Sequence, residues 1–354
     1  MPLHPVFGHA ELQQRLATAM AARTLPTALL LVGPPGVGKQ RLGLWLAQGI
    51  VCEQGPGAPC GTCHACRLAL SLNHPDIHWF FPIPRPRADE AKQVEEAESS
   101  LTDAIAARRE SALYARPDGM CGLFLPLVRA LHRRAQMRPV MSRAKVFVLA
   151  EAERLVPQLA SQEAANAMLK VLEEPPADTY FVLTAAEPSG LLPTIRSRLV
   201  QLRVGRLTAA EVTRFLVDVA GVSERDARRR AELAGGAIGA ALEQAGAGAD
   251  DVRAAERLLA AAANPAQRFG HALGVKPYGG RGDFTGTLDA AANILRDELA
   301  RRLQGAAPGT GDAPTTRLLA QVHEIEQARR LAQGNVNPQL IVADLLRRLA
   351  EAGS

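Results

Sequence analysis

The chain has 354 residues, of which 47% are hydrophobic and 22% are charged, so it can bury a substantial core in two or three domains. Its longest apolar runs, such as residues 27–32 and 146–150, are far too short to cross a bilayer, and the N-terminus lacks the basic-then-apolar order of a signal peptide. We therefore expect a cytoplasmic protein with no membrane partner. The net charge of +5 is small for this length, so charge alone does not separate a nucleic-acid-binding surface from an ordinary solvated one.

The first 200 residues predict alternating helices and strands. Apolar residues recur at helical spacing over residues 12–22, and the apolar run 28–32, which stops at Gly33, predicts a buried strand. Two similar runs, at 145–149 and 179–183, are separated by a helical segment at 161–173. Because this alternation is typical of βαβ units, we predict an α/β fold with a parallel sheet.

After about residue 205 the strand signals vanish, and the remaining patterns are helical. Helices are predicted over residues 209–220, 223–234 and 340–352. Gly235-Gly236 and the Ala/Gly-rich stretch 245–249 are plausible breaks, and residues 305–314 predict a flexible loop.

One region fits neither pattern. Residues 82–87 alternate with proline, and a highly charged, helix-prone run follows to about residue 111. We interpret residues 88–122 as an insertion. The proline-alternating part predicts an extended connector, with a partner-docking segment as the alternative.

A phosphate-binding loop is predicted immediately after the first strand. Gly33-Pro34-Pro35-Gly36-Val37-Gly38-Lys39 matches the pattern G-x-x-x-x-G-K between a predicted strand and a predicted helix. Glycines at Gly33, Gly36 and Gly38 let backbone N–H groups turn toward phosphates, the helix N-terminus adds partial positive charge, and Lys39 adds a full one.

Two positions that usually hold Mg²⁺ beside such a loop are altered. Gln40 stands where a hydrolysing enzyme has Ser or Thr, whose hydroxyl binds the ion. The second contact is an Asp at the end of the next apolar strand, and that position is Ala150, followed by Glu151. Nucleotide-binding residues Gly33, Gly36, Gly38, Lys39 and Gln40 are therefore predicted together with impaired hydrolysis.

Four of the five cysteines predict a metal site. Cys52, Cys60, Cys63 and Cys66 lie within fifteen residues and supply four thiolates, enough for closed tetrahedral zinc with no open position for water. A structural role follows, with a redox thiol cluster as the alternative. His64 and His74 are further possible ligands that four cysteines make unnecessary, and Cys121 is interpreted as a small buried hydrophobic residue.

The order of these motifs resembles the bacterial DNA polymerase III clamp-loader subunits of the AAA+ class: delta-prime and its relatives tau and gamma. The resemblance covers most of residues 1–204. It is carried by Gly33 to Lys39, the four cysteines after the loop's helix, and the segments 164–170 (AANAMLK), 172–176 (LEEPP) and 194–198 (TIRSR).

The resemblance implies a role for Arg198. In the family the last motif normally reads Ser-Arg-Cys, and its arginine projects toward the ATP of a neighbouring subunit. The present chain has Ser197-Arg198-Leu199, which keeps the arginine. Arg198 is thus the expected catalytic residue in trans, an arginine finger, with an intramolecular salt bridge as the alternative.

The resemblance also implies a delta-prime type of function. Tau and gamma are the ATP-hydrolysing motors of the family, whereas delta-prime has degraded nucleotide motifs and serves as a rigid stator. Gln40 and Ala150 favour delta-prime, and the intact Lys39 leaves binding of ATP or ADP without turnover open. The expected protein is not an ATPase by itself but part of a DNA-directed DNA polymerase holoenzyme.

The implied architecture has three parts: an AAA+ domain at 1–204 with a zinc-binding excursion at 52–66, a helical lid at 205–247, and a helical C-terminal collar domain at 248–354. The implied partners are tau or gamma and delta in a hetero-pentamer, which loads the sliding clamp onto primed DNA. The alternatives are an active tau/gamma-like motor or another P-loop nucleic-acid ATPase. A zinc-dependent DNA-binding module is weaker, since no basic, aromatic-interleaved stretch accompanies the cysteines.

Overall fold

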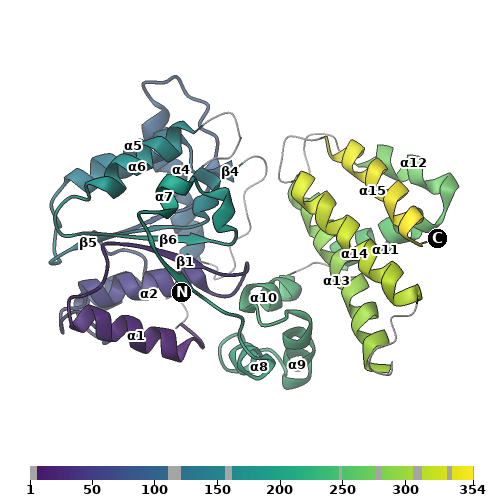
Figure 1. The fold of residues 1–354 in the computed structure, drawn as a ribbon, viewed down its shortest axis with the longest axis horizontal. Helices are drawn as coiled ribbons and strands as arrows, with labels where there is room; N and C mark the ends of the chain where they lie inside the picture. The colour runs from purple at the N-terminus through teal and green to yellow at the C-terminus, as the bar shows by residue number, and fades with distance from the viewer. Residues whose placement is uncertain are drawn as a thin grey trace. The chain divides into compact units, whose positions relative to one another are not determined.

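The computed structural model describes residues 6–110, 121–155, 162–246, 249–275, 281–305, 313–332 and 337–353. Their contacts form two compact units, the first ending at Leu242 and the second beginning at Glu243. The first unit combines a β-sheet with helices, and the described residues of the second are helical (Figure 1). The lid segment predicted as a separate part therefore groups with the α/β part as far as Leu242.

Five parallel strands form the main sheet of the first unit, in the order β2-β5-β6-β1-β7. The predicted α/β class with a parallel sheet is confirmed. The three strands predicted from apolar runs are β1, β5 and β6, and the sheet adds β2 at one edge and β7 at the other. The strands are β1 (Ala28–Val32), β2 (Ile77–Phe80), β5 (Lys145–Leu149), β6 (Thr179–Ala185) and β7 (Val200–Arg203).

Helices cover both faces of this sheet, as Figure 1 shows, with α1 and α2 on one face and α4, α5 and α6 on the other. Alternate residues of one strand enter the two cores: Val146 and Val148 pack toward α1 and α2, and Phe147 and Leu149 pack toward the opposite helices. Burial on both faces explains why the strand is a continuous apolar run. The helices are α1 (Ala10–Ala21), α2 (Lys39–Val51), α4 (Gln93–Glu110), α5 (Leu125–Gln136) and α6 (Glu163–Glu173).

The insertion contains a helix and is flanked by two short strands that pair with each other. Strands β3 (Ile83–Pro84) and β4 (Cys121–Gly122) pair antiparallel, so the segment predicted as an extended connector includes a short strand. Helix α4 packs on α5, and Glu98 forms ion pairs with Arg133 and Arg134. Residues 111–120 of the predicted insertion lie outside the described residues.

Three helices follow β7 in the segment predicted as a lid: α8 (Ala209–Asp218), α9 (Glu224–Leu233) and α10 (Ile238–Gly246). Helix α8 begins at a capping box, in which the Thr208 hydroxyl accepts from the N–H of Glu211 and the Glu211 carboxylate accepts from the N–H of Thr208. The predicted break at Gly235-Gly236 separates α9 from α10, and both glycines have positive φ.

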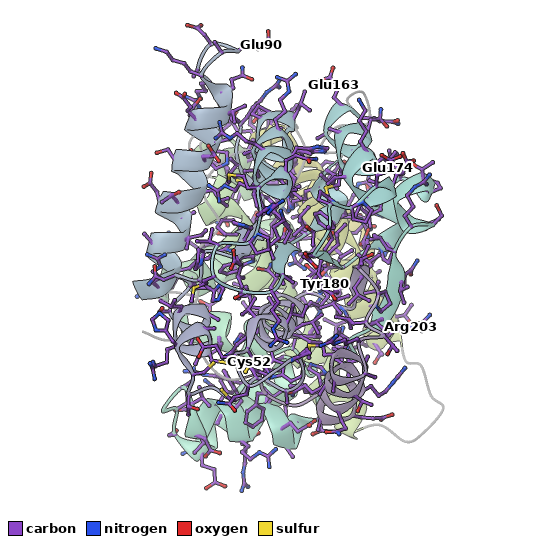
Figure 2. The ribbon with its side chains drawn as sticks, turned by 90° about the vertical axis from the view of Figure 1, so that its left-hand side faces the viewer. Cys52, Glu90, Glu163, Glu174, Tyr180 and Arg203 are labelled. Atoms are coloured by element: carbon purple, nitrogen blue, oxygen red, sulfur yellow. The ribbon has the colours of Figure 1, made fainter. Side chains whose placement is uncertain are left out.

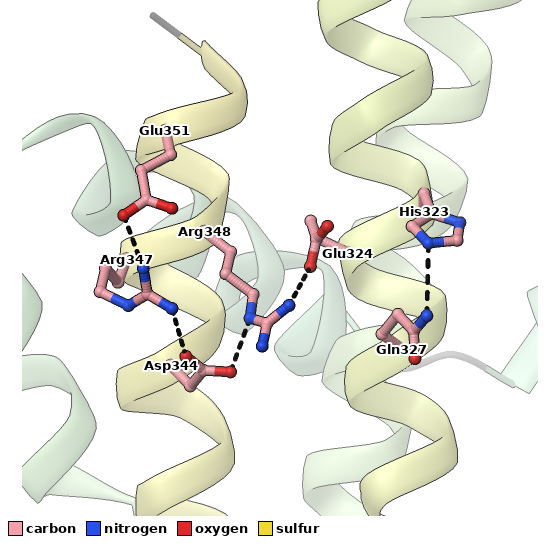
Figure 3. Close-up of polar contacts among 7 residues, drawn as sticks. All are labelled: His323, Glu324, Gln327, Asp344, Arg347, Arg348 and Glu351. Carbon is pink, nitrogen blue, oxygen red and sulfur yellow. Dashed lines mark hydrogen bonds and ion pairs between the residues drawn. The ribbon is translucent and has the colours of Figure 1, made fainter.

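The described part of the second unit contains helices that share one apolar core. Their polar faces are joined by arginine–carboxylate pairs. Arg348 on α15 contacts Glu324 on α14 at 3.5 Å and Asp344 on its own helix at 2.7 Å (Figure 3). The helices are α11 (Ala249–Ala263), α12 (Pro265–Gly274), α13 (Arg281–Gly305), α14 (Ala313–Ala332) and α15 (Pro338–Gly353).

Two predicted connections fall partly outside the described residues: 247–248 of the Ala/Gly-rich break, and 306–312 of the predicted loop at 305–314. A search of the described helices for a stretch long and apolar enough to span a membrane finds none.

Candidate nucleotide site and metal centre

The glycine-rich loop lies between β1 and α2, in the strand-loop-helix order that the sequence predicts. Two of its glycines are required by the backbone. Gly36 and Gly38 have φ of 76° and 95°, a region that other residues rarely adopt. A Cβ on Gly33 would lie 2.1 Å from the carbonyl oxygen of Val204, so only glycine fits there as well.

Lys39 is directed back onto its own loop. Its Nζ donates to the carbonyl oxygens of Gly33 at 2.7 Å and Pro34 at 2.8 Å. The side chain is buried, and burial lowers the pKa of Lys39 against the opposing attraction of Glu153 and Glu151. The ammonium that would contact phosphates is therefore bonded within the loop, and a nucleotide must compete with these two bonds.

Helix α10 packs directly on this loop. The N–H of Gly239, in helix α10, donates to the carbonyl oxygen of Gly36 at 2.8 Å. A Cβ on Gly239 would lie 2.8 Å from the Cα of Gly36, so the two backbones meet at a distance that only glycine allows. The loop is thus hydrogen-bonded to helix α10 through main-chain atoms.

The N-terminal segment makes a second link between loop and lid. The Nε2–H of His9 donates to the carbonyl oxygen of Val37 at 2.9 Å. Two residues earlier, the ring of Phe7 packs edge-on against Phe215 of α8, with centroids 5.5 Å apart. Residues 7–9 therefore bridge the two elements, which the sequence did not predict.

Two carboxylates follow the end of β5, and each accepts a hydrogen bond, although Glu153 Oε2 is buried without a hydrogen-bond partner among the described residues. Ala150 is fully buried and offers no ligand. Glu151 accepts from Arg154 Nε at 2.8 Å, and Glu153 Oε1 accepts from the N–H of Ala186 at 3.0 Å. Burial raises the pKa of Glu153. Gln40, the second residue of α2, is half-buried.

The four predicted cysteines form one cluster. Their sulfur atoms all lie within 4.8 Å of one another; Cys52 and Cys63 are 4.0 Å apart and Cys60 and Cys66 are 3.8 Å apart. A tetrahedral ion with metal–sulfur bonds of about 2.3 Å needs sulfur separations of roughly 3.8 Å. The N–H of Cys63 lowers the pKa of Cys60 to about 6, whereas burial raises the pKa of Cys52 and Cys66, so the sulfur geometry carries the assignment. The cluster is suited to a structural metal ion.

The cysteine cluster is anchored at the C-terminal end of α2. Cys52, labelled in Figure 2, is the residue that ends this helix, and Cys63 begins α3 (His64–Leu70), its sulfur accepting from the N–H of Cys66. Gln48 Nε2 donates to the Cys66 carbonyl at 3.4 Å. Neither His64 nor His74 joins the cluster among the described residues; His74 lies against Ser142 instead.

Arg198 follows the short helix α7 (Pro193–Arg196) and precedes β7. Its Nη2 lies 2.6 Å from Glu173 Oε1, and its Nη1 donates to the Thr194 carbonyl at 2.8 Å. The intramolecular salt bridge considered from the sequence is therefore present. The Arg198 and Glu173 side chains remain 35% and 47% exposed, so the guanidinium is held in place while still open to solvent.

Several residues that shape these sites were not identified from the sequence. Gly239, His9 and Phe7 carry no chemical signal of their own, because their contacts join segments far apart in the chain. Glu173 lies in a motif quoted for the resemblance, yet its contact with Arg198 crosses 25 positions. Cys121, interpreted as buried, is only half-buried in strand β4.

Comparison with known proteins identifies the family to which the α/β part of the chain is similar. Residues 8–208, more than half of the chain, match the family model described as "DNA polymerase III, delta subunit". The delta-prime subunit of Yersinia pestis is 36% identical over 172 residues, covering 48% of this chain and 39% of that protein. The delta-prime subunit of Pseudomonas aeruginosa is 32% identical over 191 residues, covering 53% and 46%.

The gamma/tau subunit of Mycobacterium tuberculosis strain H37Rv is 30% identical over 194 residues, covering 54% of this chain and 27% of that protein. The matching segment thus spans less than half the length of each of these curated relatives. A crystal structure of a DNA polymerase III gamma-subunit-related protein from Thermotoga maritima covers 98% of this chain and 100% of its own, at 15% identity and a TM-score of 0.38, which is too low to define a shared fold.

Proposed function

The chain belongs to the DNA polymerase III delta-prime family, a clamp-loader group related to gamma and tau, and from this membership we propose that it is a non-hydrolysing clamp-loader subunit. In this role it assembles with gamma or tau and delta in a hetero-pentamer that places the sliding clamp on primed DNA. The lid at 205–247 and the helical domain at 248–354 serve as lid and collar.

The bonding of the phosphate loop to itself and to helix α10 is the observation that carries this proposal. Lys39 Nζ bonds two carbonyls of its own loop, and Gly36 bonds Gly239 of the lid. A phosphate would have to replace the two Lys39 bonds, while the Gly36–Gly239 contact holds the loop against helix α10. The loop then serves as a joint that fixes the lid, which suits a rigid stator, and any bound ATP or ADP is not hydrolysed.

Metal-assisted phosphoryl transfer lacks its usual ligands here. The hydroxyl and the Asp that hold Mg²⁺ in hydrolysing P-loop proteins are replaced by Gln40 and Ala150. Glu151 is engaged through Oε2 by Arg154. These replacements argue against the alternative of an active motor.

Arg198 is the group through which the chain contributes to hydrolysis. Glu173 and Thr194 hold its guanidinium, which keeps further N–H donors for the phosphate of a neighbouring subunit. Positive charge placed there neutralises charge on the transferred phosphoryl group. For the cysteine cluster, we propose zinc as the ion, in a structural role.

The isolated chain is expected to show no ATP hydrolysis above background, because Lys39 is bonded within its own loop and the usual Mg²⁺ ligands are replaced. Replacing Lys39 with alanine should therefore leave both the isolated chain and the assembled loader with unchanged turnover. A phosphate-release assay on both variants tests this. Robust hydrolysis by the isolated chain that disappears in Lys39→Ala would instead identify an active motor.

Removing the support of Arg198 is expected to lower turnover without weakening nucleotide binding. Glu173→Ala should reduce kcat of the assembled loader about tenfold, because a misplaced guanidinium stabilises the transition state poorly, while KM stays constant. Glu173→Gln keeps a hydrogen-bond acceptor and should restore most of the rate. Equal loss in both variants, or a loss that adds fully to that of Arg198→Ala, contradicts the positioning role.

A further inference from the structure

Residues 137–143, the α5–β5 loop, expose an unusual set of side chains. Met137, Val140 and Met141 are 57%, 77% and 42% exposed, three large apolar groups within five residues. Arg138 and Arg143 are also exposed, and within the described ranges neither has an ion-pair partner. Isolated exposed apolar residues are ordinary, but a cluster of them flanked by free cations is typical of a contact surface.

A buried carboxylate holds the backbone of this loop. Asp76 is 1% exposed, and its two oxygens accept from the N–H groups of Val140 at 2.5 Å, Met141 at 2.9 Å and Ser142 at 2.7 Å. Three successive N–H groups directed inward leave the Val140 and Met141 side chains directed outward. The exposed tip is therefore fixed in one conformation.

Two further buried groups hold the same loop. Lys145 Nζ donates to the carbonyl oxygens of Ala135 and Met137, and His74 bonds the Ser142 hydroxyl at 3.2 Å. Eight polar or charged side chains are buried among the described residues, and Asp76, Lys145 and His74 are three of them. Burying such groups is unfavourable unless they are fully bonded, so an exposed loop held by three of them is unusually rigid.

The Ser142–His74 contact is not a nucleophile with its base. His74 Nδ1 accepts from the N–H of Asp76 at 3.1 Å, so the ring proton is on Nε2 and is donated to Ser142. A base must instead accept the hydroxyl proton. The network therefore serves to hold the loop.

The sheet topology indicates what the loop faces. The loop precedes β5 and Arg198 precedes β7, and because all five strands are parallel, both lie at the amino-terminal edge of the sheet. Three strand spacings separate them, roughly 14 Å. The phosphate loop follows β1 at the opposite edge. A stable subunit interface is wider than this distance, so an interface that receives Arg198 and continues along the same edge of the sheet reaches the α5–β5 loop.

We propose that the α5–β5 loop is a preformed docking element for the neighbouring loader subunit to which Arg198 is directed. This rests on the proposed function. Val140 and Met141 enter an apolar depression on that subunit, and Arg138 and Arg143 pair with carboxylates on its rim. A rigid loop loses little conformational freedom on binding, which favours affinity.

The test measures assembly of the full-length chain with purified gamma/tau-type and delta-type subunits of the same organism. Val140→Ser combined with Met141→Ser should weaken assembly about tenfold or more in a fluorescence titration, because truncated central apolar anchors lose most of their contribution. Val140→Ile, the matched control, should assemble like the unmodified chain. Asp76→Asn should also weaken assembly, because it loosens the loop backbone although every exposed residue of the loop keeps its identity.

These measurements distinguish failure of the docking element from failure of the proposed clamp-loader function. Arg198→Ala should assemble normally, since its defect is in turnover. Unchanged assembly of the double serine variant overturns the docking element alone, whereas failure of the unmodified chain to assemble overturns both proposals. The isolated variants should bind a primed DNA oligonucleotide with unchanged affinity; a loss of DNA binding with intact assembly would make the loop a nucleic-acid contact and overturn its assignment to a protein.

Discussion

Arg198→Ala is expected to abolish most of the ATP hydrolysis at the neighbouring site that this arginine serves. Arginine fingers contribute factors on the order of a thousand or more to phosphoryl transfer, because they neutralise charge that develops only in the transition state. The DNA-stimulated turnover of the reconstituted loader should fall by the fraction that this neighbouring site contributes to the total. Nucleotide binding should change little, since the effect is on kcat.

The folding of the chain should survive this replacement. The Arg198–Glu173 pair is partly exposed, and such pairs contribute at most about 1 kcal/mol. Arg196→Ala, two residues away, is the matched control and should leave turnover unchanged. Normal turnover by Arg198→Ala in a loader shown to contain it would remove the proposed role in trans and leave the arginine as a partner of Glu173.

Cys63→Ala is expected to release the metal ion and unfold the segment around it. Cys63 supplies a ligand and also begins helix α3, so its loss removes two supports together. Binding of structural zinc in small modules is worth on the order of 10 kcal/mol, enough to decide whether a short glycine- and proline-rich segment folds. Elemental analysis should find about one zinc per unmodified chain and almost none in the variant.

The consequences of metal loss should be local first. Limited proteolysis is expected to cut the variant within residues 52–66, and calorimetry should show a lowered Tm because the segment packs on α2 through Gln48. Cys121→Ala is the control, since Cys121 lies outside the cluster, and should retain the ion. Absence of zinc after reducing, chelator-free purification would contradict the metal assignment.

The sequence was sufficient where structure depends on local pattern. The apolar run 145–149 predicted β5 because both faces of that strand are buried. The short edge strand β7 was missed because three of its four residues are exposed, so it lacks that run. Likewise, cysteine spacing predicted the metal cluster, since all four ligands come from one short segment.

Contacts between distant segments were beyond the sequence. The contact between the phosphate loop and helix α10 depends on Gly36 and Gly239. These glycines are about 200 positions apart, and their contact involves only main-chain atoms. No side-chain chemistry marks such a pair. The support of the α5–β5 loop by Asp76 is hidden for the same reason: an aspartate in a connecting segment is ordinary until the fold buries it beneath three N–H groups.

The parallel sheet gives the molecule a direction. Its carboxyl edge holds a phosphate loop bonded to helix α10, and its amino edge carries Arg198, for which we propose a role toward another subunit. Subunits joined head to tail through unlike surfaces form a polar series. A subunit that supplies an arginine to its neighbour but does not hydrolyse nucleotide itself completes one active site and adds none. It therefore stands at one end of the row of active sites. In the proposed non-hydrolysing role, this chain is therefore a terminus of the catalytic arc.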